Sequence, residues 1–328
     1  MILSFKEEQI FVHSFQYQLG NTRRDLGQLQ AEKLLVGRAE DLAALGYRYS
    51  FGLAKSETLL SLASGPLSRV LQSFPKPAGF VFQHCYAESA VLPYDRAEVN
   101  IALRTRYFPA EVMRQLQVDH LPYFCSFASG CSGFMSLLGA AGGALASAPD
   151  EGSMVCVMAD CMPPGVPYNM LEERILGSDH SSAFLVGRDE RGYQLLAVGY
   201  YSTTRTRVPF VEVVKRTVQM IQELAANLAL DLASGDVTVH YPNIFPETWK
   251  MVTRYLRNPR VEHLLDGMAE RAHCMASDSV ISLAKYHRGE EGRIHIAVNY
   301  GVGLHLAACV LKEKANNGSI AGAPPELI

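Results

Sequence analysis

Short runs of β-branched and aromatic residues alternate with longer helical patterns along most of the 328-residue chain. Residues 80–83 and 154–158 read as strands, and each run ends at small or polar residues. Alternation of this kind predicts an α/β fold in which strands lead into helices. Functional side chains in such folds gather at the carboxyl ends of the strands.

The later part of the chain repeats this pattern. It predicts helices over residues 211–230, 246–256 and 276–286, and strands over 237–239, 293–298 and 304–311. We expect the last two strands to pair across the turn at 299–303, and the Asn-, Gly- and Pro-rich final residues to form a loose tail. Each half carries a strand, a reactive side chain at its end and a following helix, which indicates an ancient duplication.

The composition excludes several classes of protein. A net charge of −3, with 19% charged and 48% apolar residues, is typical of a globular protein and argues against nucleic-acid or membrane partners. The chain has no stretch of about 18 apolar residues and no basic segment followed by an apolar one at its start, so we expect a cytoplasmic location. Its seven cysteines are odd in number and lack CxxC pairs and zinc-site spacing, which predicts reduced thiols and no metal site.

One cysteine stands in a pattern that favours chemistry. Residues 126–134 read SFASGCSGF, with small residues on both sides of Cys131 and a helical pattern after it. The positive end of a helix dipole favours a thiolate, which is the nucleophilic form of cysteine. A buried cysteine in a helix packed through small residues is the structural alternative.

The same residues resemble the nucleophile motif of the type III ketoacyl synthases, condensing enzymes of the thiolase superfamily. The family's stretch like NAACAGF reads here ASGCSGF. Residues 177–183 (GSDHSSA) resemble its GDGAGA turn, 240–243 (HYPN) its HQAN, and 299–303 (NYGVG) its FGGG loop. The resemblance runs from about Gly46 onward. It implies a thiolase fold, a five-layered αβαβα arrangement of two similar halves: residues 1–190 with the nucleophilic cysteine and 191–328 with the catalytic histidine.

The resemblance also implies roles for single residues. Cys131 would carry an acyl group as a thioester, and His240 would polarise that thioester or the attacking donor. The backbone N–H groups of Cys131 and Val302 would form an oxyanion hole. Further substrate contacts are expected from the HYPN and NYGVG motifs and their surroundings: Asn243, Cys274, Tyr300, Gly301 and Gly303.

The third catalytic position departs from the family. Type III enzymes have an asparagine there, in GNTSAAS, whereas this chain reads AHCMASDS over residues 272–279. An ungapped comparison places Cys274 at that position, and one inserted residue places His273 there, as in the GHLLGAAG motif of type I and II ketoacyl synthases. His273 is therefore a third candidate catalytic residue, with helix capping or packing as its structural alternative.

A second departure is a shorter stretch before the helix at 211–230. It contains Arg205 and Arg207, which could meet the phosphates of a carrier-protein arm or of coenzyme A, or simply lie in a solvated loop.

Three functions remain open on the sequence. The first is Claisen-type condensation of the Cys131-bound acyl group with a malonyl or β-ketoacyl thioester, in a specialised polyketide or fatty-acid-derived pathway. The second is an acyltransferase that passes the acyl group to a hydroxyl or amine, which the missing asparagine favours modestly. The third is a non-catalytic partner subunit of a ketosynthase heterodimer. The resemblance implies a dimer of two identical chains or of this chain and a homologue. It also implies thioesters of coenzyme A or of acyl-carrier protein as substrates and no cofactor.

Overall fold

The strands of the two halves of the chain lie in the same order. In the computed structural model, β2 (Phe11–Leu19), β5 (Gly79–Gln83), β8 (Tyr123–Ser126), β9 (Ser153–Asp160) and β12 (His180–Gly187) follow the order β8-β5-β9-β12-β2. The second set is β13 (Tyr193–Ser202), β14 (Val237–His240), β15 (Glu262–Leu264), β16 (Ile294–Gly301) and β17 (His305–Glu313), in the order β15-β14-β16-β17-β13. When the strands of each set are numbered along the chain, both sets therefore have the spatial order third, second, fourth, fifth, first.

Strand directions repeat as well. β5 is parallel to β8 and β9, as β14 is to β15 and β16, whereas β12 and β17 are antiparallel to both of their neighbours. The sets join where β2 meets β13 at two residue pairs, Phe11 with Gln194 and Val12 with Tyr193. The predicted boundary at residue 190 falls between β12 and β13, and the division of the chain into residues 1–190 and 191–328 stays a prediction.

The structure describes the whole chain except residues 93–105, 128, 149–151, 164, 171–173, 206–207, 234–235, 259, 266, 302–304 and 316–328. Its α-helices are α1 (Leu26–Ala31), α2 (Ala39–Ala44), α3 (Leu59–Ser73), α5 (Phe108–Gln115), α6 (Gly133–Ser147), α7 (Phe210–Asn227), α8 (Pro246–Leu256), α9 (Met268–Arg271) and α10 (Ser277–Tyr286). Shorter pieces are β1 (Ile2–Ser4), β3 (Thr22–Asp25), β4 (Tyr49–Gly52), β6 (Val91–Leu92), β7 (Arg106–Tyr107), β10 (Asn169–Met170), β11 (Ile175–Leu176) and the 3-10 turns η1 (Ala87–Ala90) and η2 (Gly130–Ser132). Within these described parts, every helix is too short or too polar to cross a bilayer.

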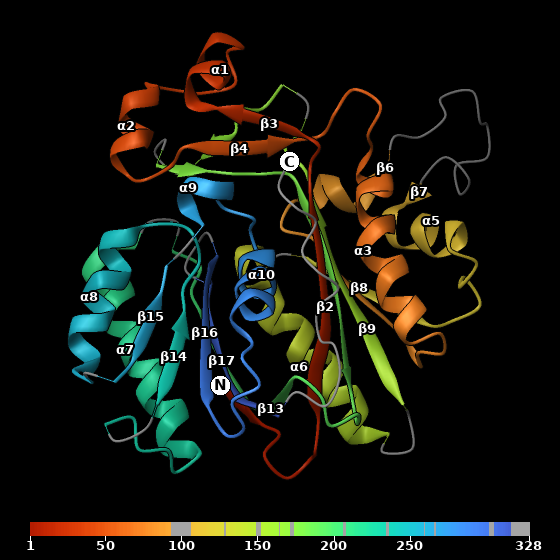
Figure 1. Cartoon of the computed structure of the whole chain (residues 1–328), viewed down its shortest axis with the longest axis vertical. Helices are drawn as coiled ribbons and strands as arrows, with labels where there is room; N and C mark the ends of the chain where they lie inside the picture. The colour runs from red at the N-terminus through yellow and green to blue at the C-terminus, as the bar shows by residue number, and fades with distance from the viewer. Residues whose placement is uncertain are drawn as a thin grey trace.

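Alternating side chains of the strands create three helix-packing layers. In β17, Ala307, Cys309 and Leu311 pack with α6 and α10, while the residues between them pack with α7 and α8. In β9, Cys156 and Met158 join the same central core, while their neighbours pack with α3 and α5. A strand period of two therefore puts α6 and α10 between the two sheet halves and the other helices outside (Figure 1).

These observations confirm the predicted α/β class and its five-layered αβαβα arrangement. The elements expected at 80–83, 154–158, 211–230, 237–239, 246–256, 276–286 and 293–298 are present within a few residues of their predicted bounds. β16 and β17 pair antiparallel, as predicted. The strand predicted from residue 304 is seen from His305, and the predicted tail lies outside the described residues.

A small outer unit covers one end of this arrangement. α1, α2 and the antiparallel pair β3 and β4 lie together beside α9 (Figure 1, top). Apolar side chains of this unit, including Leu29, Leu42 and Tyr47, share a buried cluster with Cys131 and Met275. The region around Cys131 is therefore enclosed by the N-terminal part of the chain as well as by both halves of the sheet.

Candidate active site

Cys131 lies between the end of a strand and the start of a central helix. β8 ends at Ser126, the turn η2 holds Cys131, and α6 begins at Gly133. The N–H groups of such a first turn have no partner within the helix, so the sulfur lies at the positive end of α6. The residue is 8% exposed.

The last residue of β16 lies against this turn. A Cβ atom built on Gly301 would lie 2.6 Å from the carbonyl oxygen of Ser129 and 3.4 Å from the backbone nitrogen of Cys131. Only glycine fits that gap, so β16 approaches the nucleophile closely, as the FGGG resemblance implies. Val302 and Gly303 lie outside the described residues, and the oxyanion hole stays a prediction.

His273 is the histidine that meets the sulfur. Its Nε2 lies 3.2 Å from Cys131 Sγ. The residue sits between α9 and α10, and its backbone is fixed on both sides: its N–H donates to Leu176 and its carbonyl accepts from Ser178. His273 thus comes from the C-terminal half and faces a nucleophile from the N-terminal half.

The other ring nitrogen of His273 is held by a carboxylate that the sequence analysis missed. Nδ1 lies 2.6 Å from Oδ2 of Asp278, in the first turn of α10. Asp278 also accepts hydrogen bonds from the backbone N–H groups of Asn243 (2.9 Å) and Cys274 (3.1 Å). These donors fix the carboxylate, and the carboxylate orients the imidazole. Nucleophile, base and orienting acid therefore form one buried row.

The charged forms of Cys131, His273 and Asp278 stabilise one another. A hydrogen bond from the Cys85 thiol lowers the pKa of Cys131 most; burial opposes this, and His273 lowers the pKa further, so it falls well below that of an ordinary thiol. Burial disfavours a charged His273, but the Cys131 thiolate and Asp278 outweigh it and raise the pKa of His273 to about 10. Burial would likewise raise the pKa of Asp278, yet His273 and Arg271 lower it. At neutral pH the row is a thiolate, an imidazolium and a carboxylate.

The structure gives His240 partners other than Cys131. Its Nδ1 lies 2.7 Å from Ser282 Oγ and its Nε2 lies 2.9 Å from Nδ1 of His295, which in turn meets Glu313 at 2.8 Å. Burial, with His295 and Arg293, lowers the pKa of His240 well below its ordinary value, so the ring is neutral. The expected pairing of Cys131 with His240 is therefore replaced by a pairing with His273, because both nitrogens of His240 are engaged in the core.

The remaining predicted contacts are distributed around this row. Asn243 donates its side-chain amide to the carbonyl of Ala272 (3.0 Å) and to Asp278 (3.2 Å). Cys274 is fully buried with its sulfur toward the carbonyl of Arg271, so of the two candidates for the third position it is His273 that reaches Cys131. The ring of Tyr300 packs edge-on against Phe245, and the Cys131 thiolate contributes to raising its pKa after burial.

The structure describes one of the two arginines. Arg205 forms an ion pair with Glu212 in the first turn of α7. Arg207 lies outside the described residues. Binding of phosphate by either arginine stays a prediction.

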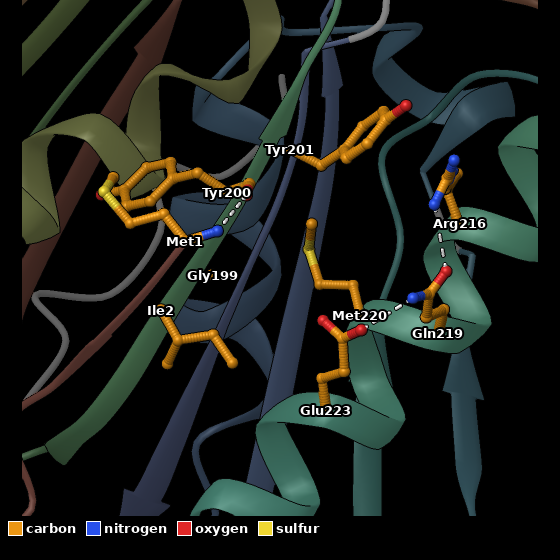
Figure 2. A pocket seen from close by; sticks show the side chains of 9 residues that line it. All are labelled: Met1, Ile2, Gly199, Tyr200, Tyr201, Arg216, Gln219, Met220 and Glu223. Atoms are coloured by element: carbon orange, nitrogen blue, oxygen red, sulfur yellow. Dashed lines mark hydrogen bonds between the residues drawn. The ribbon is translucent and has the colours of Figure 1, made fainter.

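A separate hollow lies against the outer face of the C-terminal half. It measures about 140 Å³ and is lined by β1, the end of β13 and α7, with Arg216, Gln219 and Glu223 linked in a row along the helix (Figure 2). None of the predicted site residues lines it. Its polar side chains are already paired with one another, so it adds no chemistry to the row at Cys131.

Comparison with solved structures places this arrangement in a known fold. The chain superposes on 3-oxoacyl-[acyl-carrier-protein] synthase III from Aquifex aeolicus VF5 with a TM-score of 0.72, at 15% sequence identity, over 92% of this chain and 99% of that one. The chain has the thiolase fold. It is similarly close to ChlB3, described as an acyltransferase (TM-score 0.73, 16% identity, 93% and 98% covered), and to a tetronic acid condensing enzyme (0.71, 15%, 92% and 99%). No protein-family model and no curated protein matches the sequence.

Proposed function

We propose that this thiolase-fold protein is an acyltransferase that carries its acyl group on Cys131. The observation that carries the proposal is the position of His273, whose Nε2 is 3.2 Å from the sulfur while Asp278 holds Nδ1. The thiolate attacks the carbonyl carbon of an acyl thioester and the C–S bond to the donor breaks. The departing thiolate takes the proton of the His273 imidazolium and becomes a thiol, which leaves an acyl-Cys131 thioester and a neutral imidazole.

Neutral His273 is then the base for the second step. It removes a proton from the acceptor, the acceptor attacks the thioester carbonyl, and Cys131 leaves as a thiolate beside the restored imidazolium. The donor is proposed to be a thioester of coenzyme A or of acyl-carrier protein; the description of the similar synthase from Aquifex aeolicus names the latter. The apolar cluster around Cys131 suits a fatty or polyketide-like acyl chain.

The acceptor is proposed to be a hydroxyl or an amine. Decarboxylative condensation needs donors for an enolate oxygen. The family resemblance offers His240 and His273 for this role and Asn243 as a substrate contact. Of these, His240 is engaged with Ser282 and His295, and the Asn243 amide with Ala272 and Asp278. Only His273 faces the sulfur, which suits a single general base. Condensation, the first function named by the sequence, is the second candidate, and the similarity to a tetronic acid condensing enzyme favours it.

Mass spectrometry after incubation with an acyl-coenzyme A tests the acyl-enzyme. We expect the mass of one acyl group on Cys131, and its complete loss in Cys131→Ala because no other thiol is paired with a base among the residues that the structure describes. Cys125→Ala is the matched control, since this partly buried thiol lies on β8 and its pKa is raised by burial to about 11. An acyl mass that persists in Cys131→Ala, or none in the wild type, contradicts the proposal and leaves the non-catalytic partner subunit.

Labelled carbon dioxide separates the two acceptor classes. Acyl-enzyme mixed with malonyl thioester labelled in its free carboxyl group should release no label if the acceptor is a hydroxyl or amine. Release that depends on Cys131 would instead establish condensation.

A dimer is proposed on the exposed edge of the N-terminal sheet half. β8 ends the strand order, and aromatic side chains along it and after it are exposed: Tyr123 (43%), Phe124 (42%) and Phe127 (56%). An edge strand of this kind presents unpaired backbone groups and apolar surface, which a second copy would cover.

Light scattering on the eluted protein tests this dimer. We expect wild type to have the mass of two chains and the double variant Phe124→Lys, Phe127→Lys that of one, because buried lysines oppose association. Tyr255→Lys, on an equally exposed aromatic of α8, should keep the dimer mass. A wild-type protein of one-chain mass would contradict the homodimer and direct the search to a sister protein. The cytoplasmic location and the specialised pathway stay predictions.

A further inference from the structure

The peptide group between Gly130 and Cys131 lies between the two halves of the sheet. On one side, the carbonyl oxygen of Gly130 accepts a hydrogen bond at 3.1 Å from Nε2 of Gln83, the last residue of β5. On the other side, a Cβ atom built on Gly301, the last residue of β16, would lie 3.4 Å from the backbone nitrogen of Cys131. The oxygen of this peptide group therefore lies beside β5 and its nitrogen beside β16.

The geometry of a peptide group couples its two ends. The peptide bond between Gly130 and Cys131 is trans, and a trans peptide is planar, so its C=O and N–H bonds point in opposite directions. A group that fixes the direction of the Gly130 carbonyl thereby fixes the direction of the Cys131 N–H. The N–H groups at the start of a helix have no partner within the helix, so this one is available to a substrate.

Two hydrogen bonds hold the Gly130 carbonyl. One comes from the backbone N–H of Gly133 in the same turn, and the other comes from Gln83. A carbonyl oxygen has two lone pairs, so the two donors occupy both of them. The bond from Gly133 is local and moves with the turn, whereas the bond from Gln83 ties the peptide group to the sheet.

Gln83 is a polar residue in an apolar position. It is 0% exposed and follows Val81 and Phe82, which are buried in the core. Its Oε1 atom is buried and has no hydrogen-bond partner within the described part of the chain. A buried acceptor without a partner destabilises a fold, so an apolar side chain of the same length would suit stability at least as well. The amide is therefore better explained by the site than by the core.

The start of α6 leaves room for this amide. A Cβ atom on Gly133 would lie 2.0 Å from Cδ of Gln83, which is closer than two such atoms can approach. The φ angle of Gly133 is −58°, an ordinary helical value, so the backbone conformation does not require glycine. The absence of a side chain at this position is what lets Gln83 reach the Gly130 carbonyl.

We propose that Gln83 is a positioning residue that, through the Gly130 carbonyl, aims the backbone N–H of Cys131 at the carbonyl oxygen of the acyl donor. The inference deepens the proposed function and rests on it. When the Cys131 thiolate attacks, the electron pair of the C=O bond moves onto the oxygen, and the oxyanion accepts a hydrogen bond from this N–H. The pair then re-forms the C=O bond as the C–S bond to the donor breaks. A donor whose direction is already fixed needs no reorganisation during the reaction.

Two reactions of Cys131 test the proposal, both read on the Cys131 peptide by mass spectrometry. Acetylation by p-nitrophenyl acetate passes through an oxyanion, whereas alkylation by iodoacetamide displaces iodide from a saturated carbon and forms none. Gln83→Met keeps the length of the side chain without the amide. We expect it to slow acetylation about 10–100-fold, less than the about 10²–10³-fold for removal of an oxyanion-hole donor, and to alkylate within about threefold of wild type.

A second variant and a matched control accompany this test. Gly133→Ala should give the same difference between the two reactions, because its methyl group displaces the Gln83 amide, and it replaces Gln83→Met should that variant not fold. Tyr200→Phe is the control. Tyr200 also donates to a carbonyl of α6, that of Met135 at 2.6 Å, but not to the turn of Cys131, so both rates should stay within about threefold of wild type. Thermal unfolding should show Gln83→Met to be at least as stable as wild type.

Three results would overturn the proposal. Acetylation at the wild-type rate in a folded Gln83→Met would make the amide a packing group. Equal losses of acetylation and alkylation would indicate a general loosening of the turn. A wild-type Cys131 that is alkylated but never acetylated would exclude an oxyanion hole at this sulfur. The ester requires no recognition of coenzyme A, so a protein that reacts with it but not with acyl-coenzyme A would contradict the proposed function and not the role of Gln83.

Discussion

Replacement of His273 by glutamine is expected to slow acylation of Cys131 by about 10²–10⁴-fold. Glutamine retains a hydrogen-bond donor near the sulfur but cannot exchange a proton with it, so Cys131 loses both its counter-ion and the acid that protonates the departing thiol. The measurement is the growth of the acyl-enzyme mass in single-turnover samples quenched at increasing times.

His240→Gln is the comparison that decides between the two histidines. Because His240 contacts Ser282 and His295 rather than Cys131, we expect this variant to acylate within about threefold of wild type and to lose thermal stability, since breaking a buried hydrogen-bond network is costly. The reverse ranking, with a large loss in His240→Gln and a small one in His273→Gln, would return the catalytic role to His240 and refute the row described here.

The element pattern and the nucleophile were within reach of sequence reasoning. Strands such as β5 and β9 are continuous apolar runs because helices cover both of their faces, and α7 has the spacing of a half-buried helix. Cys131 stands out because its neighbours are small and a helix follows. These are local patterns, and local patterns can be recognised in a sequence without knowledge of the tertiary structure.

The histidine that contacts Cys131 was predicted wrongly because the sequence does not show in which direction the His240 side chain points. His240 is the last residue of β14, in register with Ala297 of β16, and its ring turns toward α10 and His295. The polar residue beyond the strand end is Asn243, which reaches Asp278 instead. His240 and Asn243 are three residues apart, yet the first lies in the core and the second at the site. The order of the motifs along the chain does not distinguish between two positions that are this close.

The pairing of Asp278 with His273 and the place of Cys85 in the apolar cluster around Cys131 were missed for different reasons. Asp278 lies five residues after His273 in a helix first turn, a position that also suits any carboxylate through the helix dipole, so its pairing with His273 was a weak signal. Cys85 lies 46 positions before Cys131 in the chain, and the adjacency of β5 and β8 brings both residues to one apolar cluster. Strand order in a parallel sheet is a non-local property that this single sequence did not reveal.

Replacement of Asp278 by asparagine is the second change with a large expected effect, a loss of about 10²–10⁴-fold in the acylation rate. Asparagine matches aspartate in volume and can still accept the N–H of Cys274. Its amide nitrogen, however, would then take the place of Oδ2 and face both Nδ1 of His273 and the N–H of Asn243, from which Oδ2 now accepts. An amide N–H opposite Nδ1 forces the histidine to carry its proton on Nε2 only, so the imidazolium that stabilises the Cys131 thiolate and protonates the departing thiolate is lost.

Glu313→Gln is the matched control for Asp278→Asn. Glu313 is also a buried carboxylate hydrogen-bonded to a histidine, but that histidine is His295, which contacts His240 and not Cys131. We expect it to lower the temperature of unfolding while the acylation rate stays within about threefold of wild type. The reason is that removal of the Glu313 charge weakens its hydrogen bond to His295 in the core and leaves the surroundings of the Cys131 sulfur unchanged. Equal losses of acylation in the two variants would show that general loosening of the central layer, rather than orientation of His273, accounts for the effect. Loss confined to Asp278→Asn, in protein that still unfolds cooperatively, would mean that the carboxylate acts through the imidazole.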